Sequence, residues 1–219
     1  LEDVAKGLDE SLRNPDLDYV DMYLMHSMLS VTLPDKPYEG IPECNPQVDF
    51  VETYKAMEKL LETGKTKAIG VSNFSQANLK RPLANTSVVP ATNQVELHPY
   101  LPQPKLVEFC KANGILVTAY SPLGSTAEFN LRDDPVITKI AKARNAMPSQ
   151  VLLAWGVKRG TVVIPKSTNK ERIIENFHLA GITNEDLAKI NAITHQAWFA
   201  EPGNFFGRAY QGMFGFEGA

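Results

Sequence analysis

The sequence predicts an α/β fold built on a parallel sheet. Two observations lead to this fold class. Five short apolar runs are bounded by polar residues, as buried strands are. A helical pattern follows each run before the next one begins, and such alternation is typical of parallel strands joined by helical crossovers. A doubly wound sheet and a (β/α) barrel both fit this order. The expected strands cover residues 19–25, 67–72, 92–97, 115–120 and 161–165.

The helical segments have their own signals. In the first of them, Val4, Leu8 and Leu12 lie four residues apart on one face. Gly64 ends the second helix, and Pro148 suits the first turn of a later one. No Ser, Thr or Asn precedes the first helix as a cap, so we expect a further segment upstream. The expected helices cover residues 1–13, 48–63, 75–84, 101–114, 134–145, 148–159, 169–178 and 184–194.

Two stretches have no helical or strand pattern. The loop 27–47 holds four prolines, and loops of this length are usually functional or mobile. The tail from residue 195 is rich in glycine and aromatic residues, including Trp198 and Phe216. We expect this tail to line a pocket or to pack over the sheet. No Gly- or Ser-rich linker divides the chain, so residues 1–219 are expected to form a single domain.

Composition narrows the classes of function. The chain is 43% hydrophobic and 21% charged, as soluble globular proteins are, and its net charge of −3 argues against a general nucleic-acid binder. No apolar run approaches the ~18 residues that a membrane-spanning helix needs. Cys44 and Cys110 do not form the pattern of a disulfide scaffold, and no signal-peptide pattern opens the chain. We therefore expect a cytoplasmic protein.

Polar or aromatic side chains stand where each of the five expected strands ends. Because loops after parallel strands meet at one rim, these residues could share a site. For any one of them the alternative is structural: a histidine can be a core residue, and an Asn or Ser can cap a turn. The strand ends read His26-Ser27, Ser72-Asn73-Phe74, Glu96-Leu97-His98, Tyr120-Ser121 and Lys166-Ser167.

The stretch 164–176, IPKSTNKERIIEN, has the chemistry of an anion site. A strand delivers Lys166, a capped helix start offers backbone N–H groups, and Arg172 could bind a phosphate through two parallel N–H bonds. The alternative is a solvated basic helix start whose charge Glu171 and Glu175 balance. Tyr120 could stack on a flat heterocycle.

Several other site types are not supported. The sequence has no G-x-G-x-x-G, no G-x-S-x-G and no P-loop pattern. His26, His98, His178 and His195 are scattered, with no spacing that suggests a metal site.

Six stretches together resemble the aldo-keto reductase family, in that family's order and over nearly the whole chain. They are DYVDMYLMH, GKTKAIGVSNFS, NQVELHPYLPQPKLVEFCKANGI, AYSPLGS, VLLAWGV and VVIPKSTNKERIIENF. The resemblance implies a TIM (β/α)₈ barrel and an NADPH-dependent oxidoreductase that reduces aldehydes or ketones. The five expected strands match the fourth to the eighth strand of that barrel, so the barrel in this chain is incomplete and N-terminally truncated.

The resemblance also assigns roles to individual residues. His26 matches the active-site histidine, and Ser72, Asn73 and Gln94 match the residues that hold the nicotinamide carboxamide. Tyr120 matches the residue that stacks on the nicotinamide ring. The remaining matches are to the contacts of the pyrophosphate (Ser121, Leu123 and Ser125), the adenosine 2′-phosphate (Lys166, Ser167, Thr168 and Arg172) and the adenine (Glu175 and Asn176). A Lys166 and Arg172 pair implies NADPH rather than NADH.

Two departures from the family pattern affect function. The family's catalytic Asp, Tyr and Lys lie on earlier strands, so only His26 of that group is on this chain. Ser27-Met28 stands where the family often has Trp-Pro, which leaves open which small carbonyl compound is the substrate. The alternative function is a truncated, catalytically impaired NADP(H)-binding module. The two outer strands of an incomplete barrel would be open edges, so we also expect self-association or a partner chain there.

Overall fold

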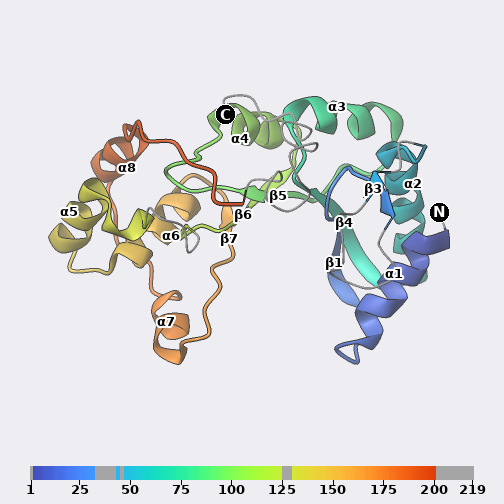
Figure 1. The fold of residues 1–219 in the computed structure, drawn as a ribbon, viewed down its shortest axis with the longest axis horizontal. Helices are drawn as coiled ribbons and strands as arrows, with labels where there is room; N and C mark the ends of the chain where they lie inside the picture. The colour runs from blue at the N-terminus through green and yellow to red at the C-terminus, as the bar shows by residue number, and fades with distance from the viewer. Residues whose placement is uncertain (1, 33–42, 45–46, 125–129, 201–219) are drawn as a thin grey trace. The chain divides into compact units, whose positions relative to one another are not determined.

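The structure is a computed structural model that describes residues 2–32, 43–44, 47–124 and 130–200. Five strands form one sheet in the order β1-β4-β5-β6-β7, and β1 pairs in parallel with β4, as β6 does with β7 (Figure 1). The strands are β1 (Val20–Met25), β4 (Thr66–Ser72), β5 (Thr92–Glu96), β6 (Leu116–Tyr120) and β7 (Val162–Val163).

The α-helices follow the strands as the sequence predicts. Their bounds are α1 (Glu2–Arg13), α2 (Phe50–Leu60), α3 (Gln76–Asn85), α4 (Pro104–Ala112), α5 (Pro135–Ala143), α6 (Pro148–Lys158), α7 (Lys170–Glu175) and α8 (Asn184–Asn191). Two short 3₁₀ helices, η1 (Leu61–Thr63) and η2 (Leu131–Asp133), complete the described elements. None of the helices in the described ranges is long and apolar enough to cross a membrane.

The described residues cluster into two compact units, which we call unit 1 and unit 2. Unit 1 holds residues up to Asn93 together with Glu108–Ile115, and unit 2 holds Gln94–Val107 and the residues from Leu116 to Ala200. The boundary falls inside β5. The expectation of one domain over residues 1–219 stays a prediction.

In unit 1, β1 and β4 pack closely. Their register pairs Met25 with Val71, so the two strands end together at His26 and Ser72. A Cβ at Gly70 would lie 2.7 Å from the Thr92 carbonyl oxygen and 2.8 Å from a Leu24 methyl carbon, which is closer than any side chain tolerates. Because Gly70 has no Cβ, the Thr92 backbone and the Leu24 side chain can lie close to β4.

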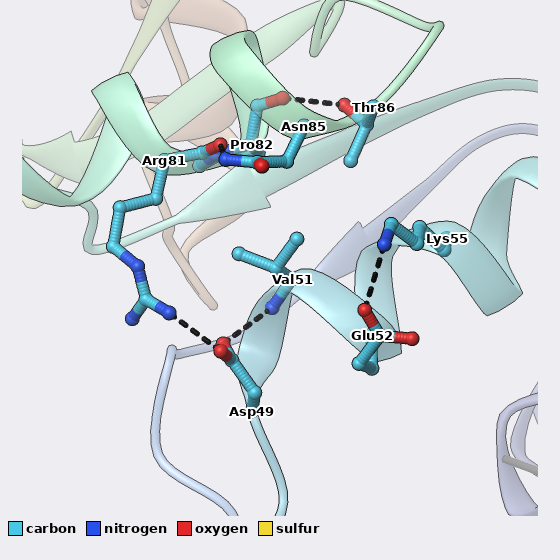
Figure 2. Close-up of polar contacts among 8 residues, drawn as sticks. All are labelled: Asp49, Val51, Glu52, Lys55, Arg81, Pro82, Asn85 and Thr86. Carbon is cyan, nitrogen blue, oxygen red and sulfur yellow. Dashed lines mark hydrogen bonds and ion pairs between the residues drawn. The ribbon is translucent and has the colours of Figure 1, made fainter.

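Two helices of unit 1 are joined through a charged cap. The Asp49 carboxylate accepts the Val51 N–H and so caps α2, and it also pairs with the Arg81 guanidinium on α3 (Figure 2). That guanidinium lies 4.5 Å from the centroid of the Phe50 ring, which in turn meets Phe74 edge-on at 5.3 Å. The network links α3 to the start of α2 and to Phe74 in the turn after β4.

In unit 2, α6 lies against β7. The helix buries every residue from Val151 to Gly156, as expected for a segment that is apolar all round. A Cβ at Gly156 would lie 2.6 Å from a Val163 methyl carbon, so the glycine is what lets the helix approach the strand. The Thr161 hydroxyl donates to the Gly156 carbonyl at 2.7 Å and closes the turn between them.

The elements differ from the sequence predictions in three places. The expected loop 27–47 contains a short antiparallel pair, β2 (Val31–Thr32) and β3 (Glu43–Cys44). The expected strand 161–165 is a strand only at Val162–Val163, although the Ile164 N–H still donates to the Ala119 carbonyl at 3.1 Å. The expected helix 169–178 ends at Glu175, and of the possible caps Ser167, Thr168 and Asn169 it is Asn169 that caps its start.

Candidate functional site

The ends of β1 and β4 are tied together by Asn73. Its Nδ2 donates to the His26 carbonyl at 2.9 Å and to the Ser72 hydroxyl at 3.2 Å. Asn73 adopts a positive φ of 63°, a backbone conformation that Asn tolerates better than most residues. The structure therefore brings together three of the predicted site residues, His26, Ser72 and Asn73, within unit 1. The His26 side chain is exposed and Ser72 is buried.

The backbone beyond Asn73 is held by a buried amide. Asn93 is fully buried, and its side chain accepts the Phe74 N–H at 3.3 Å and donates to the Phe74 carbonyl at 2.8 Å. The oxygen and the nitrogen of the Asn93 side-chain amide thus both bond to the main chain of Phe74, which fixes the turn after β4. Asn93 was not among the predicted site residues, because a buried Asn inside a strand has no distinctive sequence pattern.

In unit 2, Gln94 lies in β5 and Tyr120 ends β6, as predicted. The Tyr120 carbonyl accepts the Leu97 N–H at 3.3 Å. Burial, followed by the charge of the Glu96 carboxylate, raises the pKa of the Tyr120 phenol, so the ring stays neutral at physiological pH. Ser121 follows with a positive φ of 49°, which turns the chain sharply into the loop Ser121–Gly124. A non-glycine residue in that conformation is a strained position of the kind found at ligand sites.

A pocket of about 380 Å³ in unit 2 is lined by several of the predicted dinucleotide contacts. Six predicted residues line it, and they come from the loop after β6, the end of β7 and α7. They are Leu123, Lys166, Ser167, Arg172, Glu175 and Asn176. Thr168 is exposed and is not part of the lining, and Ser125 lies outside the described residues.

The pocket carries excess positive charge. Arg132, Lys166 and Arg172 line it together with two carboxylates, those of Asp133 and Glu175. Among the described residues, no side chain or backbone group pairs with the charged ends of Lys166 and Arg172. Unpaired cations around one cavity attract an anionic ligand. The backbone N–H of Arg172 is already taken by the Asn169 side chain at 3.0 Å, so the anion chemistry lies in the side chains rather than in the start of α7.

Arg132 is the main pocket residue that sequence reasoning missed. Its Nε donates to the Asn130 Oδ1 at 3.0 Å, while the Asn130 Nδ2 donates to Asp133 at 2.8 Å. These bonds orient the guanidinium within η2. The Asn130 cap and the Asp134-Pro135 helix start are visible in the sequence, but neither reveals that η2 borders the pocket. The other unpredicted lining residues are Asn130 and Asp133 beside Arg132, and Met147, Pro148 and Ser149 at the start of α6.

No group of three or more His, Cys, Asp or Glu side chains within the described ranges is arranged to hold a metal ion. The aromatic tail was expected to line a pocket or pack over the sheet. Trp198 and Phe199 are described, but Phe205, Phe206, Tyr210, Phe214 and Phe216 lie outside the described residues.

A family model described as the aldo/keto reductase family matches residues 2–195. The chain belongs to this family. The resemblance seen in the sequence is therefore confirmed, and so is the fold class. The solved structure of the aldose reductase from Schistosoma japonicum superposes with a TM-score of 0.86 at 33% identity, over 94% of this chain and 69% of that one.

Two characterised relatives come from fungi. The glycerol 2-dehydrogenase (NADP(+)) of Saccharomyces cerevisiae is 45% identical over 87% of this chain, and the D-galacturonate reductase of Hypocrea jecorina is 43% identical over 86%. The chain spans 65% and 62% of the length of these two proteins.

Proposed function

We propose that this chain provides the NADPH-binding part of an oxidoreductase that reduces aldehydes or ketones. The observation that carries the proposal is a pocket in unit 2 that is lined by six residues assigned to dinucleotide contacts. Two of these six, Lys166 and Arg172, and the neighbouring Arg132 give the pocket three cations. A dinucleotide with a 2′-phosphate adds two negative charges that NADH lacks. The family membership and the relative named as NADP(+)-dependent support the same cofactor.

The residues present fit the cofactor. Lys166 and Arg172 are unpaired cations on the pocket wall, and they would hold the 2′-phosphate, with Glu175 and Asn176 at the adenine. Asn73 uses its Nδ2 on the His26 carbonyl. The family resemblance assigns Asn73, Ser72 and Gln94 to the nicotinamide carboxamide, and their amide and hydroxyl groups are of the kind that binds a carboxamide. Tyr120 would offer its ring face to the nicotinamide.

When bound, NADPH supplies the hydride for the reduction. This chain contributes His26, whose main-chain carbonyl is held by Asn73 and whose exposed imidazole would orient the substrate carbonyl by a hydrogen bond. The family resemblance assigns the general acid to a Tyr on an earlier strand. We therefore propose that turnover requires that strand and that the substrate is a small carbonyl compound. We also propose a cytoplasmic location, because Cys44 and Cys110 do not form the pattern of a disulfide scaffold.

A binding titration tests the cofactor assignment directly. The chain is titrated with NADPH and with NADH while the fluorescence of the reduced nicotinamide is followed. We expect NADPH to bind at least about 10-fold more tightly, because one or two charge-assisted hydrogen bonds contribute ~1.5–3 kcal/mol each. Equal affinities for the two dinucleotides would overturn the 2′-phosphate assignment. NADPH consumption with a simple aldehyde then separates an active reductase from a binding module.

We also propose that the outer strands of the sheet pair with another polypeptide segment. β1 and β7 stand at the two ends of the strand order. Apolar side chains beside them are exposed: Tyr19 and Met22 at 45% and 40%, and Val162 and Ile164 at 40% and 43%. Unpaired strand edges with exposed apolar residues readily bind further strands. Light scattering of the purified 219-residue chain, with its intact mass, tests this proposal, and a stable monomer of that mass would contradict it.

A further inference from the structure

A buried carboxylate lies outside the predicted site. Glu96, the last residue of β5, is 1% exposed, and His98 two residues later is fully buried. The His98 Nε2 donates to the Glu96 Oε1 at 2.8 Å, and the His98 Nδ1 has no hydrogen-bond partner among the described residues. Burying two polar groups in this way is unfavourable unless the carboxylate has further donors.

Those donors come from a segment about a hundred residues away in the chain. The Phe199 N–H donates to the Glu96 Oε1 at 2.7 Å, and the Ala200 N–H donates to the Oε2 at 2.9 Å. The Ala197 N–H donates to the Tyr100 carbonyl at 3.1 Å, which adds a third backbone contact to the same segment. Both carboxylate oxygens therefore hold the start of the C-terminal segment, residues 197–200, in place.

The Phe199 side chain connects the segment held by Glu96 to the dinucleotide pocket. Its ring lies 4.7 Å from the His98 ring, centroid to centroid. The Phe199 ring also lies close to Gly124: a Cβ built on Gly124 would be 3.3 Å from a Phe199 ring carbon. Gly124 closes the loop Ser121–Gly124 with an N–H bond to the Ser121 carbonyl at 3.0 Å, and Leu123 of that loop lines the pocket.

We propose that Glu96 is a positioning residue that couples the C-terminal segment to dinucleotide binding through Phe199. With the segment seated on the carboxylate, the Phe199 ring supports the loop whose Leu123 forms the pocket wall. Binding in the pocket and seating of the segment then stabilise each other, because a coupling free energy between two sites is reciprocal. The inference rests on the proposed NADPH function.

Hydrogen–deuterium exchange on the chain, with and without NADP⁺, measures the anchor and the coupling separately. We expect the Phe199 and Ala200 amides to exchange slowly without ligand and at least about 5-fold more slowly when the pocket is saturated, the lower end of usual coupling. Glu96→Gln removes one acceptor oxygen and places an N–H₂ group against N–H donors. We expect it to abolish the slow exchange and to weaken NADP⁺ binding by about 5- to 50-fold.

A Phe199→Ala variant separates the hydrogen bonds that hold the segment from the coupling of the segment to NADP⁺ binding. Its result does not depend on whether the Glu96→Gln variant folds. The backbone N–H groups remain, so the Ala200 amide should still exchange slowly, while NADP⁺ binds about 5-fold more weakly or worse. Asp186→Asn is the matched control, because Asp186 is another buried carboxylate that accepts a backbone N–H, from Thr183 in the α8 cap. It should leave NADP⁺ affinity unchanged.

The outcomes separate the two proposals. If NADP⁺ binds the unaltered chain but binds the Phe199→Ala variant equally well, the coupling is wrong and the cofactor assignment stands. If NADP⁺ does not bind the unaltered chain at all, the proposed function fails and the coupling fails with it. Fast exchange of both amides in the unaltered chain would show that the carboxylate does not hold the segment.

Discussion

Each unit holds a group of predicted site residues, and the two groups are organised by different means. In unit 1, His26, Ser72 and Asn73 are connected by hydrogen bonds of the Asn73 amide, so the protein itself holds this group together. In unit 2, the pocket presents Lys166 and Arg172 with no described partner for their charges. The unit 1 group is therefore preorganised, whereas we expect the two cations of unit 2 to become ordered when an anion binds.

The largest effect should come from the unpaired cations. Replacing both Lys166 and Arg172 with Met removes two charge-assisted contacts, so we expect NADPH affinity to fall about 100-fold or more. NADH affinity should change by less than about 3-fold, because NADH has no 2′-phosphate to lose. Calorimetric titration with both dinucleotides measures the ratio.

The control for this double variant is Lys139→Gln. Lys139 is an exposed cation on α5 that does not line the pocket, so its loss tests for a general charge effect. An equal loss of affinity for NADH in the double variant would mean that the two cations hold the pyrophosphate or the fold rather than the 2′-phosphate.

Changes in the unit 1 group should alter the free energy of unfolding rather than the affinity for phosphate. Asn73→Ala removes the hydrogen bond to the His26 carbonyl and leaves a Cβ residue at a φ of 63°. We expect a loss of ~2 kcal/mol in unfolding free energy, from about 1 for the bond and about 1 for the left-handed backbone. Asn73→Gly keeps the backbone relaxed and should lose about half as much. Urea denaturation of both variants separates the two contributions.

Arg132 tests whether the pocket extends to the residue that the sequence did not suggest. Its guanidinium is oriented by Asn130, so Arg132→Leu should weaken NADPH binding by about 10-fold, the usual value of one exposed charged contact. Arg132→Lys keeps the charge but not the planar fork. Recovery of most of the affinity in Arg132→Lys indicates a phosphate contact, and failure to recover indicates stacking of the guanidinium on the adenine. Unchanged binding in both variants would exclude Arg132 from the site.

The sequence predicted most strands and helices, because the spacing of apolar residues and the capping residues at helix starts can be recognised within a short stretch of sequence. Asp49, Ser75, Asn169 and Thr183 all cap the helices that they precede. It missed β2 and β3, which depend on pairing with each other rather than on any local pattern. It also extended β7 and α7 beyond Val163 and Glu175, the residues at which strand and helix end in the structure.

The site was predictable for residues that match the family motifs and not for those that only tertiary contacts define. Six assigned residues line one pocket, and Asn73 joins the strand ends at which it was placed. Asn93, Arg132 and Glu96 were not assigned roles, because only folding places each of them beside segments that are distant in the chain. The Glu96 carboxylate meets the Phe199 and Ala200 N–H groups only after the chain has folded.

The smallest effect concerns the charged cap that supports the preorganised unit. The Val51 N–H bond and the Arg81 guanidinium hold the pKa of the Asp49 carboxyl below its ordinary value, against a modest opposing effect of burial. A carboxyl whose pKa is lowered on folding stabilises the folded state above its unfolded pKa, and this contribution is lost as pH falls through the folded pKa. Asp49 should therefore stabilise unit 1 near neutral pH and not in acid.

Asp49→Asn keeps a side-chain acceptor for the Val51 N–H but removes the charge that faces Arg81. Because the pair is half exposed, we expect a cost of only ~0.5 kcal/mol near neutral pH. The difference between the variant and the unaltered chain should shrink as the pH falls through the folded-state pKa of Asp49, which lies below its ordinary value. Urea denaturation at a series of pH values from neutral to acid checks this sign. A difference that persists in acid would assign the effect to the geometry of the α2 cap rather than to its charge.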